Sequence, residues 1–394
     1  MNPETLSSMC AVVFWVCAAA VAYAYIGYPL LLWVFARWLS RPVSRGPFAG
    51  TASFVLAAHN EAGRVGGKRD ELLGLLDATD ISGEVIIVSD GSADLTAAAA
   101  RENADPRLHV IELAENVGKA EALTRGCVAA KGEVIVFADV RQRWAGDALQ
   151  RLLENFADPS VGGVSGDLCL ESSDGTVQGV GLYWKYEKAI RKLEGQLHSV
   201  AGATGAISAV RRNLFRPIPK GTILDDVYWP LQVVMQGFRI VHDDRAIAFD
   251  RLPEGPGDEF RRKVRTLSGN FQLVARCPSL LLPWGNPIWV QFVSHKLLRL
   301  AVPWLLIVML IGSALAPRTE YRACFLAQVA GYALAVAGLN TAVSRRIKPA
   351  AVAASFCVLN LAAFVAFWIW ISGRSGQSWR KVRYDRQPVV AAAN

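Results

Sequence analysis

The sequence predicts an α/β domain with a mostly parallel sheet, carried by apolar helices that cross a membrane. Two observations support this fold class. Between residues 53 and 139, short apolar runs alternate with helical stretches. Long uncharged runs flank the middle of the chain on both sides, and 52% of the 394 residues are hydrophobic. That share of apolar residues excludes a disordered chain, while 19% charged residues exclude a protein buried in the membrane throughout.

Four near-continuous apolar runs predict strands buried on both faces of a sheet. They cover residues 53–60, 84–90, 108–113 and 133–139, and the helical segments between them include 94–103 and 118–130. Such an order predicts a parallel sheet that binds its ligand at the carboxyl ends of the strands. Polar residues stand at those ends, namely His59, Asn60, Glu61, Asp90 and Asp139. Helix capping explains one acidic residue at a strand end more readily than three.

The loops after these strands lack two common phosphate-binding motifs. No G-x-G-x-x-G follows the first strand, and no G-x-x-x-x-G-K-[ST] is present, so a dinucleotide or a P-loop nucleotide site is not expected. Instead Gly118 and Lys119 open a helix directly after Asn116 and Val117. A helix N-terminus with an ammonium group beside it can face phosphate oxygens.

Four uncharged runs predict membrane helices, because each reaches or approaches the ~20 residues that cross a bilayer. They are residues 5–36, 300–317, 323–344 and 350–373. The first run is too long for a signal peptide and has only Glu4 before it, which favours a retained anchor. Residues 277–295 are also uncharged but contain three prolines and one glycine, which predicts an interfacial segment. The expected organisation is an anchor (1–40), the α/β domain (50–265), an interfacial segment (266–298), three transmembrane helices (299–373) and a basic tail (374–394).

Basic residues beside the apolar runs predict the orientation. Arg37, Arg41 and Arg45 follow the first run, so we expect a multi-pass protein of the inner (plasma) membrane with a cytoplasmic middle domain. If all four runs crossed, the basic tail would lie on the outer side of the membrane. Either the tail is an exception to the positive-inside rule or one run does not fully cross. Ten of the 42 Lys and Arg but only three of the 34 Asp and Glu lie outside residues 37–299. Because the excess charge is at membrane edges, nucleic acid is not an expected partner.

Six segments, in order, resemble motifs of glycosyltransferase family 2. They are AAHNEAG (57–63), VSDGSAD (88–94), ENVGKAEAL (115–123), FADVRQRW (137–144), GATGAISAVRR (202–212) and ILDDVYWPLQVVMQG (223–237). The similarity covers about residues 50–275 and is to the membrane-embedded, inverting members with a GT-A fold, such as hyaluronan, chitin-oligosaccharide, poly-N-acetylglucosamine and cellulose synthases. Each motif alone is modest, whereas six in the right order are specific.

The resemblance implies roles for individual residues. Asp226, with Asp225 beside it, would be the catalytic base. The nucleotide-sugar contacts would be Asn60, Glu61, Asp90, Asn116, Gly118, Lys119, Asp139, Arg262 and Arg265. The acceptor site would contain Gly202, Thr204, Gly205 and Trp229. Asp139 would also bind Mg²⁺ or Mn²⁺.

The chain departs from the family pattern at two places. Arg141 stands where the family has its second metal-binding acid, so a metal would depend on Asp139, diphosphate oxygens and water; alternatively Arg141 itself supplies positive charge. The Q-x-x-R-W motif appears as Arg262, Arg265 and Thr266, which keeps basic groups for the diphosphate but loses the aromatic residue at the acceptor.

Several of these residues also have simpler interpretations. Asp225 and Asp226 can cap the helix that follows them, Arg262 and Arg265 can face lipid headgroups, and Trp229 can belong to an interfacial belt.

The resemblance implies inverting transfer of a sugar from a UDP-sugar to a growing exopolysaccharide. The alternatives are transfer of a single sugar to a lipid acceptor, and a non-catalytic scaffold of an export complex. The expected partners are a UDP-sugar donor, a saccharide or lipid-linked acceptor and membrane lipids. Because three helices after the domain are few for a channel, a second copy or an export protein is also expected.

Overall fold

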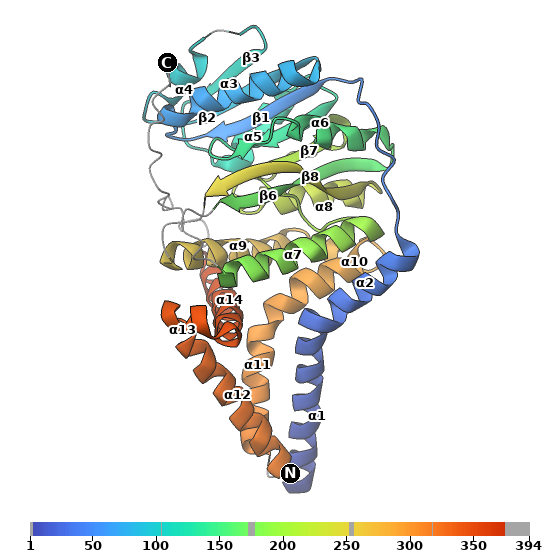
Figure 1. Ribbon diagram of the computed structural model, residues 1–394, viewed down its shortest axis with the longest axis vertical. Helices are drawn as coiled ribbons and strands as arrows, with labels where there is room; N and C mark the ends of the chain where they lie inside the picture. The colour runs from blue at the N-terminus through green and yellow to red at the C-terminus, as the bar shows by residue number, and fades with distance from the viewer. Residues whose placement is uncertain (1–2, 104, 172–177, 252–255, 317, 375–394) are drawn as a thin grey trace.

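The computed structural model is an elongated molecule with an α/β domain at one end and apolar helices at the other (Figure 1). It describes the chain except for residues 1–2, 104, 172–177, 252–255, 317 and 375–394. The predicted basic tail therefore lies outside the described residues apart from Arg374.

The domain is built on one eight-stranded sheet. Its strands are β1 (Ala52–Ala58), β2 (Gly83–Asp90), β3 (Leu108–Leu113), β4 (Val134–Ala138), β5 (Arg143–Trp144), β6 (Val161–Glu171), β7 (Ile207–Arg211) and β8 (Arg239–Arg251). The strand order is β3-β2-β1-β4-β7-β6-β8-β5. β1 to β4 are parallel to one another, which confirms the four predicted strands. β7 runs antiparallel between β4 and β6, so the sheet is mixed in its second half.

Helices cover both faces of this sheet. They are α3 (Ala62–Thr79), α4 (Thr96–Arg101), α5 (Lys119–Ala129), α6 (Ala148–Leu153) and α8 (Asp225–Met235). Buried residues of α3, α4 and α6 form one apolar core with the sheet, and those of α5 and α8 form a second core on the opposite face. The strands are apolar along their whole length because both of their faces are covered. The helices α4 and α5 confirm the two predicted from the sequence.

Two long helices lie between the domain and the membrane helices (Figure 1). They are α7 (Gln178–Leu197) and α9 (Pro256–Arg276). The sequence predicted that the α/β domain ends at residue 265 and the interfacial segment begins at residue 266, and this position falls inside α9. The broken segment that follows consists of a 3₁₀ turn (Pro278–Leu281), the short helix α10 (Trp289–Gln291) and a π-helical stretch, η5 (Phe292–Leu297).

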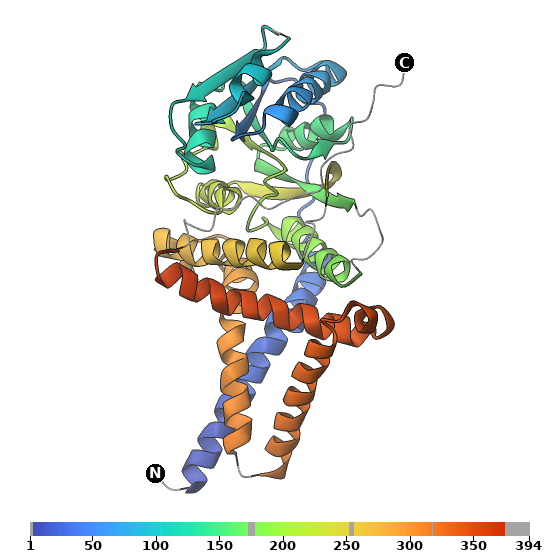
Figure 2. The same cartoon turned by 90° about the vertical axis from the view of Figure 1, so that its left-hand side faces the viewer.

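The apolar helices are not all parallel to one another. They are α1 (Pro3–Ala22), the π-helical η1 (Tyr23–Gly27), α2 (Tyr28–Leu39), α11 (Leu298–Leu315), α12 (Thr319–Ala337), the short α13 (Thr341–Arg346) and α14 (Lys348–Ile371). By length and composition, three stretches in the described chain can cross a membrane: 8–39, 289–315 and 348–371. α1, α11 and α12 stand upright below the domain, whereas α14 runs across them and packs along α9 (Figure 2).

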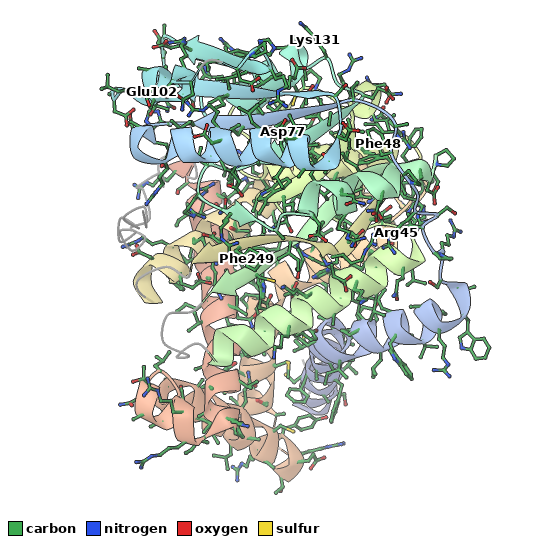
Figure 3. The ribbon with its side chains drawn as sticks, turned by 45° about the horizontal axis from the view of Figure 1, so that its top comes forward. Arg45, Phe48, Asp77, Glu102, Lys131 and Phe249 are labelled. Atoms are coloured by element: carbon green, nitrogen blue, oxygen red, sulfur yellow. The ribbon has the colours of Figure 1, made fainter. Side chains whose placement is uncertain are left out.

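The domain is fastened to the membrane helices by a buried polar cluster and by the linker after α2. Glu194 of α7 accepts hydrogen bonds from Tyr28 Oη (2.6 Å) and His295 Nδ1 (2.9 Å). Glu187, about two turns earlier on α7, pairs with Arg299 of α11. On the linker, Arg45 Nε donates to Asn155 Oδ1 (3.1 Å), and Phe48 packs against Phe156 along the side of the domain (Figure 3). These contacts fix the orientation of the domain on its helices.

Candidate active site

The site lies where the carboxyl ends of β1, β2 and β4 meet the first turns of α5 and α8. A small pocket there is lined by Lys119, Leu123, Phe137, Ala138, Asp139, Gly205, Ser208, Asp225, Asp226 and Trp229. The structure therefore brings together side chains from four of the six sequence motifs. A ligand position at the carboxyl ends of parallel strands is the general rule for open α/β sheets.

Asp90 shapes the entrance to α5. Its two carboxylate oxygens accept hydrogen bonds from the backbone N–H groups of Val117 (2.7 Å) and Gly118 (3.0 Å). Gly118 has φ +91°, a conformation that a residue with a side chain rarely adopts. The carboxylate, which is 3% exposed, thus holds the turn that aims Lys119 into the pocket.

Three loops at this end of the sheet are joined into one unit by Asn60, Gly91 and Asn116. Asn60 is left-handed (φ 53°), and its Oδ1 accepts a hydrogen bond from Ala93 N–H at 2.7 Å. Asn116 Nδ2 donates to the Asp90 carbonyl at 3.3 Å. A Cβ on Gly91, which has φ +55°, would lie 2.2 Å from Asn116 N, so only glycine permits this approach. Glu61 N–H, beside Asn60, donates to Thr96 Oγ1 at 2.8 Å and begins α3.

Lys119 is the central cation of the pocket. Its Nζ lies 2.8 Å from Asp139 Oδ1 and 3.8 Å from Asp225 Oδ2. Burial alone lowers the pKa of Lys119, but the two carboxylates outweigh burial and raise the pKa above its usual value. The ammonium therefore stays charged, and it can neutralise phosphate oxygens that approach this point.

Asp225 and Asp226 form the first turn of α8, and both face the pocket. The N-cap residue is Leu224 and no side chain caps the helix, so the interpretation of the two carboxylates as caps is wrong. Burial raises the pKa of Asp226 to about 6, and the neighbouring Asp225 carboxylate adds to this effect. Lys119 acts in the opposite direction. A half-buried carboxylate whose pKa lies a little below neutral pH is ionised there and suits a general base.

The turn before β7 packs directly against Asp226. Ala203 N–H donates to the Asp226 carbonyl at 2.7 Å, and a Cβ on Gly202 would lie 3.1 Å from Val227 Cγ2. A Cβ on Gly205 would lie 3.4 Å from Asp226 Oδ2 and 3.8 Å from Lys119 Nζ. Thr204 N–H donates to Ser165 Oγ at 3.0 Å. Gly205 thus brings the backbone of this turn into the pocket wall, close to the candidate base and to Lys119.

Trp229 also belongs to the pocket wall. Its ring is 2% exposed and packs on Phe137 with 5.5 Å between ring centroids. In this structure Trp229 is part of the core beneath the pocket and not an exposed platform for a sugar or a residue of an interfacial belt.

Two basic residues that sequence reasoning missed act on Asp226. Arg191 of α7 and Lys296 of η5 both lower the pKa of its carboxyl. Arg191 Nη1 also donates to Thr204 Oγ1 at 3.2 Å. Lys296 comes directly after the uncharged stretch 277–295. A lone charge at the end of an apolar stretch is the sequence feature that could have identified Lys296 as a functional residue.

Arg262 and Arg265 lie on α9, outside the lining of this pocket as described. Arg262 Nη2 pairs with Glu259 Oε2 of the same helix at 2.9 Å. The geometry therefore does not bring these two arginines together with Lys119 and Asp226.

Arg141 is held by Asp250 of β8. Its Nε and Nη2 donate to the two carboxylate oxygens at 3.0 and 2.8 Å. The bidentate pair directs the guanidinium toward β8 and neutralises its charge there.

Asp139 is then the single acid of this motif that faces the pocket. Among the residues that the structure describes, no group of three or more His, Cys, Asp and Glu forms a metal centre. Mg²⁺ commonly binds through one or two carboxylates, several waters and substrate phosphates. The residues present fit a divalent cation that shares its ligands with a diphosphate, and they do not fit one held by protein alone.

Comparisons with known proteins agree with this arrangement. Residues 53–218 match glycosyl transferase family 2. The chain is 28% identical over 242 residues to the poly-beta-1,6-N-acetyl-D-glucosamine synthase of Staphylococcus aureus (strain MSSA476), an alignment that covers 57% of this chain and 55% of that protein. It is 27% identical over 240 residues to the synthase of the same name from Staphylococcus epidermidis. The chain thus spans about half the length of the curated relatives that it matches.

A solved structure shares the fold over nearly the whole chain. It is a mannosyltransferase from Pyrobaculum calidifontis, in complex with GDP-Man and Mn²⁺, with a TM-score of 0.69 at 23% identity. The superposition covers 92% of this chain and 99% of that one, which confirms the predicted GT-A fold class. Residues 53–218 are thus similar to glycosyl transferase family 2, and the motif order and the pocket agree with that match.

Proposed function

We propose that the protein is an inverting, UDP-sugar-dependent glycosyltransferase that extends an exopolysaccharide at the membrane. The observation that carries this proposal is the pocket in which Asp226, Asp225 and Asp139 surround Lys119. The matched synthases make a polymer of N-acetylglucosamine, so UDP-N-acetylglucosamine is the first donor to test.

The chain's own residues support a single displacement. Asp226 would take the proton of the acceptor hydroxyl as this oxygen attacks the anomeric carbon. Lys119, released from Asp139, would offset the charge that grows on the departing diphosphate. The interlocked loops around Asp90 would hold the nucleoside so that the anomeric carbon lies in line with the attacking oxygen.

A divalent cation would supply further positive charge to the diphosphate. Asp139 would hold it, with donor oxygens and water completing the coordination. Arg141 is already paired with Asp250, and for this reason we favour the cation over Arg141 as the extra charge.

The direct test is transfer from a panel of radiolabelled UDP-sugars by the purified full chain, with and without Mn²⁺. We expect a ladder of saccharides from one donor, and UDP-N-acetylglucosamine is the expected one. Single-sugar lipid products would identify the lipid-acceptor alternative. UDP binding without turnover of any donor, when lipid and saccharide acceptors are both supplied, would contradict the proposal and favour a scaffold.

The membrane placement that fits this function is an inner (plasma) membrane protein with a cytoplasmic catalytic domain. We propose that α1, α11 and α12 cross the bilayer, while α14 lies in the plane of its cytoplasmic leaflet. By length and composition alone α14 is a candidate span and α12 is not, so the proposal rests on how the helices are arranged and on the basic residues beside them. Two observations support this arrangement. α14 runs along α9 and across the three upright helices (Figure 2). With three crossings, the basic stretches 345–348 and 374–386 both remain on the cytoplasmic side, as the positive-inside rule requires.

Reporter fusions at the C-terminus separate three crossings from four. A fluorescent protein placed after Asn394 should fluoresce, and alkaline phosphatase at the same place should be inactive. An active phosphatase would mean that α14 crosses as well. Because three upright helices are few for a polysaccharide channel, we also expect a second copy of the chain or an export protein to complete the path.

A further inference from the structure

An apolar cavity lies where the long helix α9 meets the membrane helices. Its volume is about 390 Å³, and it is lined by Phe271, Val274, Ala275, Leu297, Leu300, Ala301, Trp304, Phe367 and Trp370. These residues come from α9, η5, α11 and α14. α14 packs along α9 and also contacts α11 and α12 (Figures 1 and 2).

Aromatic side chains form the walls of the cavity. Phe271 stacks on Trp370 with ring centroids 5.7 Å apart, and Trp304 packs edge-on against Phe367 at 5.1 Å. The cluster joins one residue from α9, one from α11 and two from α14. The walls are thus held by contacts between helices that are distant in sequence.

The chemistry of the lining selects the kind of molecule that fits. Of its nine side chains, only the two indoles of Trp304 and Trp370 carry a polar atom. A saccharide in this space would leave most of its hydroxyl groups without hydrogen-bond partners, which costs about 1–3 kcal/mol for each group. Water also finds few polar partners among these side chains. A hydrocarbon chain meets neither penalty.

The position of the cavity indicates where that chain comes from. Leu300 and Trp304 belong to the membrane-crossing candidate 289–315, and Ala275 at the cavity rim is exposed. In the placement proposed above, this rim lies in the cytoplasmic leaflet, where lipid tails surround the protein. We propose that the cavity binds one acyl chain of a bilayer phospholipid, which wedges between α9, α11 and α14. This inference rests on the proposed membrane placement.

The site has a consequence for the enzyme. α9 contacts the cavity with Phe271 and Val274, while its Gly269 packs against Leu224, two residues before Asp226, with only 2.6 Å from an added Cβ to Leu224 Cγ. A chain in the cavity therefore supports the same helix that borders the start of α8. Lipid occupancy and the position of the candidate base are connected through one rigid element.

Photolabelling tests the site in the full chain. The protein is reconstituted in vesicles of phosphatidylcholine that carries a diazirine on its acyl chain, irradiated, and digested for peptide mass spectrometry. We expect label on the peptides of α9 and α14 that line the cavity. Ala301→Trp, which fills the cavity, should lower that label about tenfold because no room is left for the chain.

The matched control is Ala19→Trp, which adds the same ring on the exposed face of α1. It should leave the cavity label unchanged. If Ala301→Trp does not fold, as judged by thermal unfolding, Ala275→Phe at the rim provides the second variant and should lower the label as well.

The outcomes separate the two proposals. Equal cavity label in wild type and both filling variants would overturn the lipid site, and so would label on α1 with none on α9 and α14. Absence of label on α1 itself would instead contradict the membrane placement. Loss of cavity label during polymer synthesis would assign the cavity to the product and would also overturn the proposal.

Discussion

The two halves of the molecule position their functional side chains in different ways. In the half formed by β1 to β4, short loops and backbone groups hold the site, as when Asp90 accepts two N–H bonds from Val117 and Gly118. In the half nearest the membrane, side chains far apart in sequence pair with one another. Glu194 and His295, for example, are 101 residues apart and lie in hydrogen-bond contact at 2.9 Å. The side of the site that we propose binds the donor is thus fixed locally, whereas the half nearest the membrane depends on the packing of whole helices.

Lys119→Met should produce the largest effect on the donor side. The variant loses the ammonium group that pairs with Asp139 and lies close to Asp225, so we expect kcat to fall about 10²–10³-fold, as for other lost transition-state charges. Initial rates at saturating donor measure this effect. Lys131→Met is the matched control, because Lys131 is exposed at the edge of the domain far from the membrane helices (Figure 3). A similar loss in the control would show that the effect is not local.

The dependence of kcat/KM on pH should reveal the ionisation of Asp226, the candidate base. The pKa of Asp226 is raised to about 6, so the carboxylate becomes protonated and inactive as the pH falls below that value. We expect kcat/KM to be level above this pKa and to decline about tenfold per pH unit below it. Lys119 lowers the pKa of Asp226, and the Lys119→Met variant should therefore move the decline to higher pH. An unchanged profile in that variant would contradict the assignment.

Gly91→Ala should disturb the donor-side loops alone. The new Cβ would meet Asn116 N at 2.2 Å in a residue with φ +55°, which should cost about 1–3 kcal/mol of strain. We expect a lower melting temperature and weaker UDP binding by calorimetry. Gly146→Ala is the control, because a Cβ there meets nothing within 4 Å. Equal behaviour of the two variants would mean that the interlocked loops do not matter.

Tyr28→Phe should give the smallest effect, on the membrane side. It removes the hydroxyl that donates to the buried Glu194 at 2.6 Å, and a lost buried hydrogen bond costs about 1–3 kcal/mol. Thermal unfolding in detergent should detect this, with UDP affinity unchanged. Tyr228→Phe serves as control, since its hydroxyl has no hydrogen-bond partner in the described part of the chain. A loss of UDP affinity in Tyr28→Phe would contradict the separation of the two halves.

The same difference explains how far the sequence could be interpreted. Short motifs can be recognised directly in the sequence, and they contain Asp90, Lys119 and Asp226. All three residues lie at the expected end of the sheet. The antiparallel β7, and the position of α14 across the other helices, depend on contacts between distant segments, and hydropathy gives no sign of either. Arg191 and Lys296 escaped notice for this reason, because only the packing of α7 and η5 brings them to Asp226.

The central claim is that Asp226 removes the acceptor proton in a sugar transfer. The most direct measurement compares label transfer from UDP-N-acetylglucosamine by the wild type and by Asp226→Asn, with UDP binding measured on both. We predict a rate about 10²–10⁴-fold lower in the variant, as expected for loss of a general base, with unchanged UDP affinity. A variant that transfers the sugar at close to the wild-type rate would contradict this account.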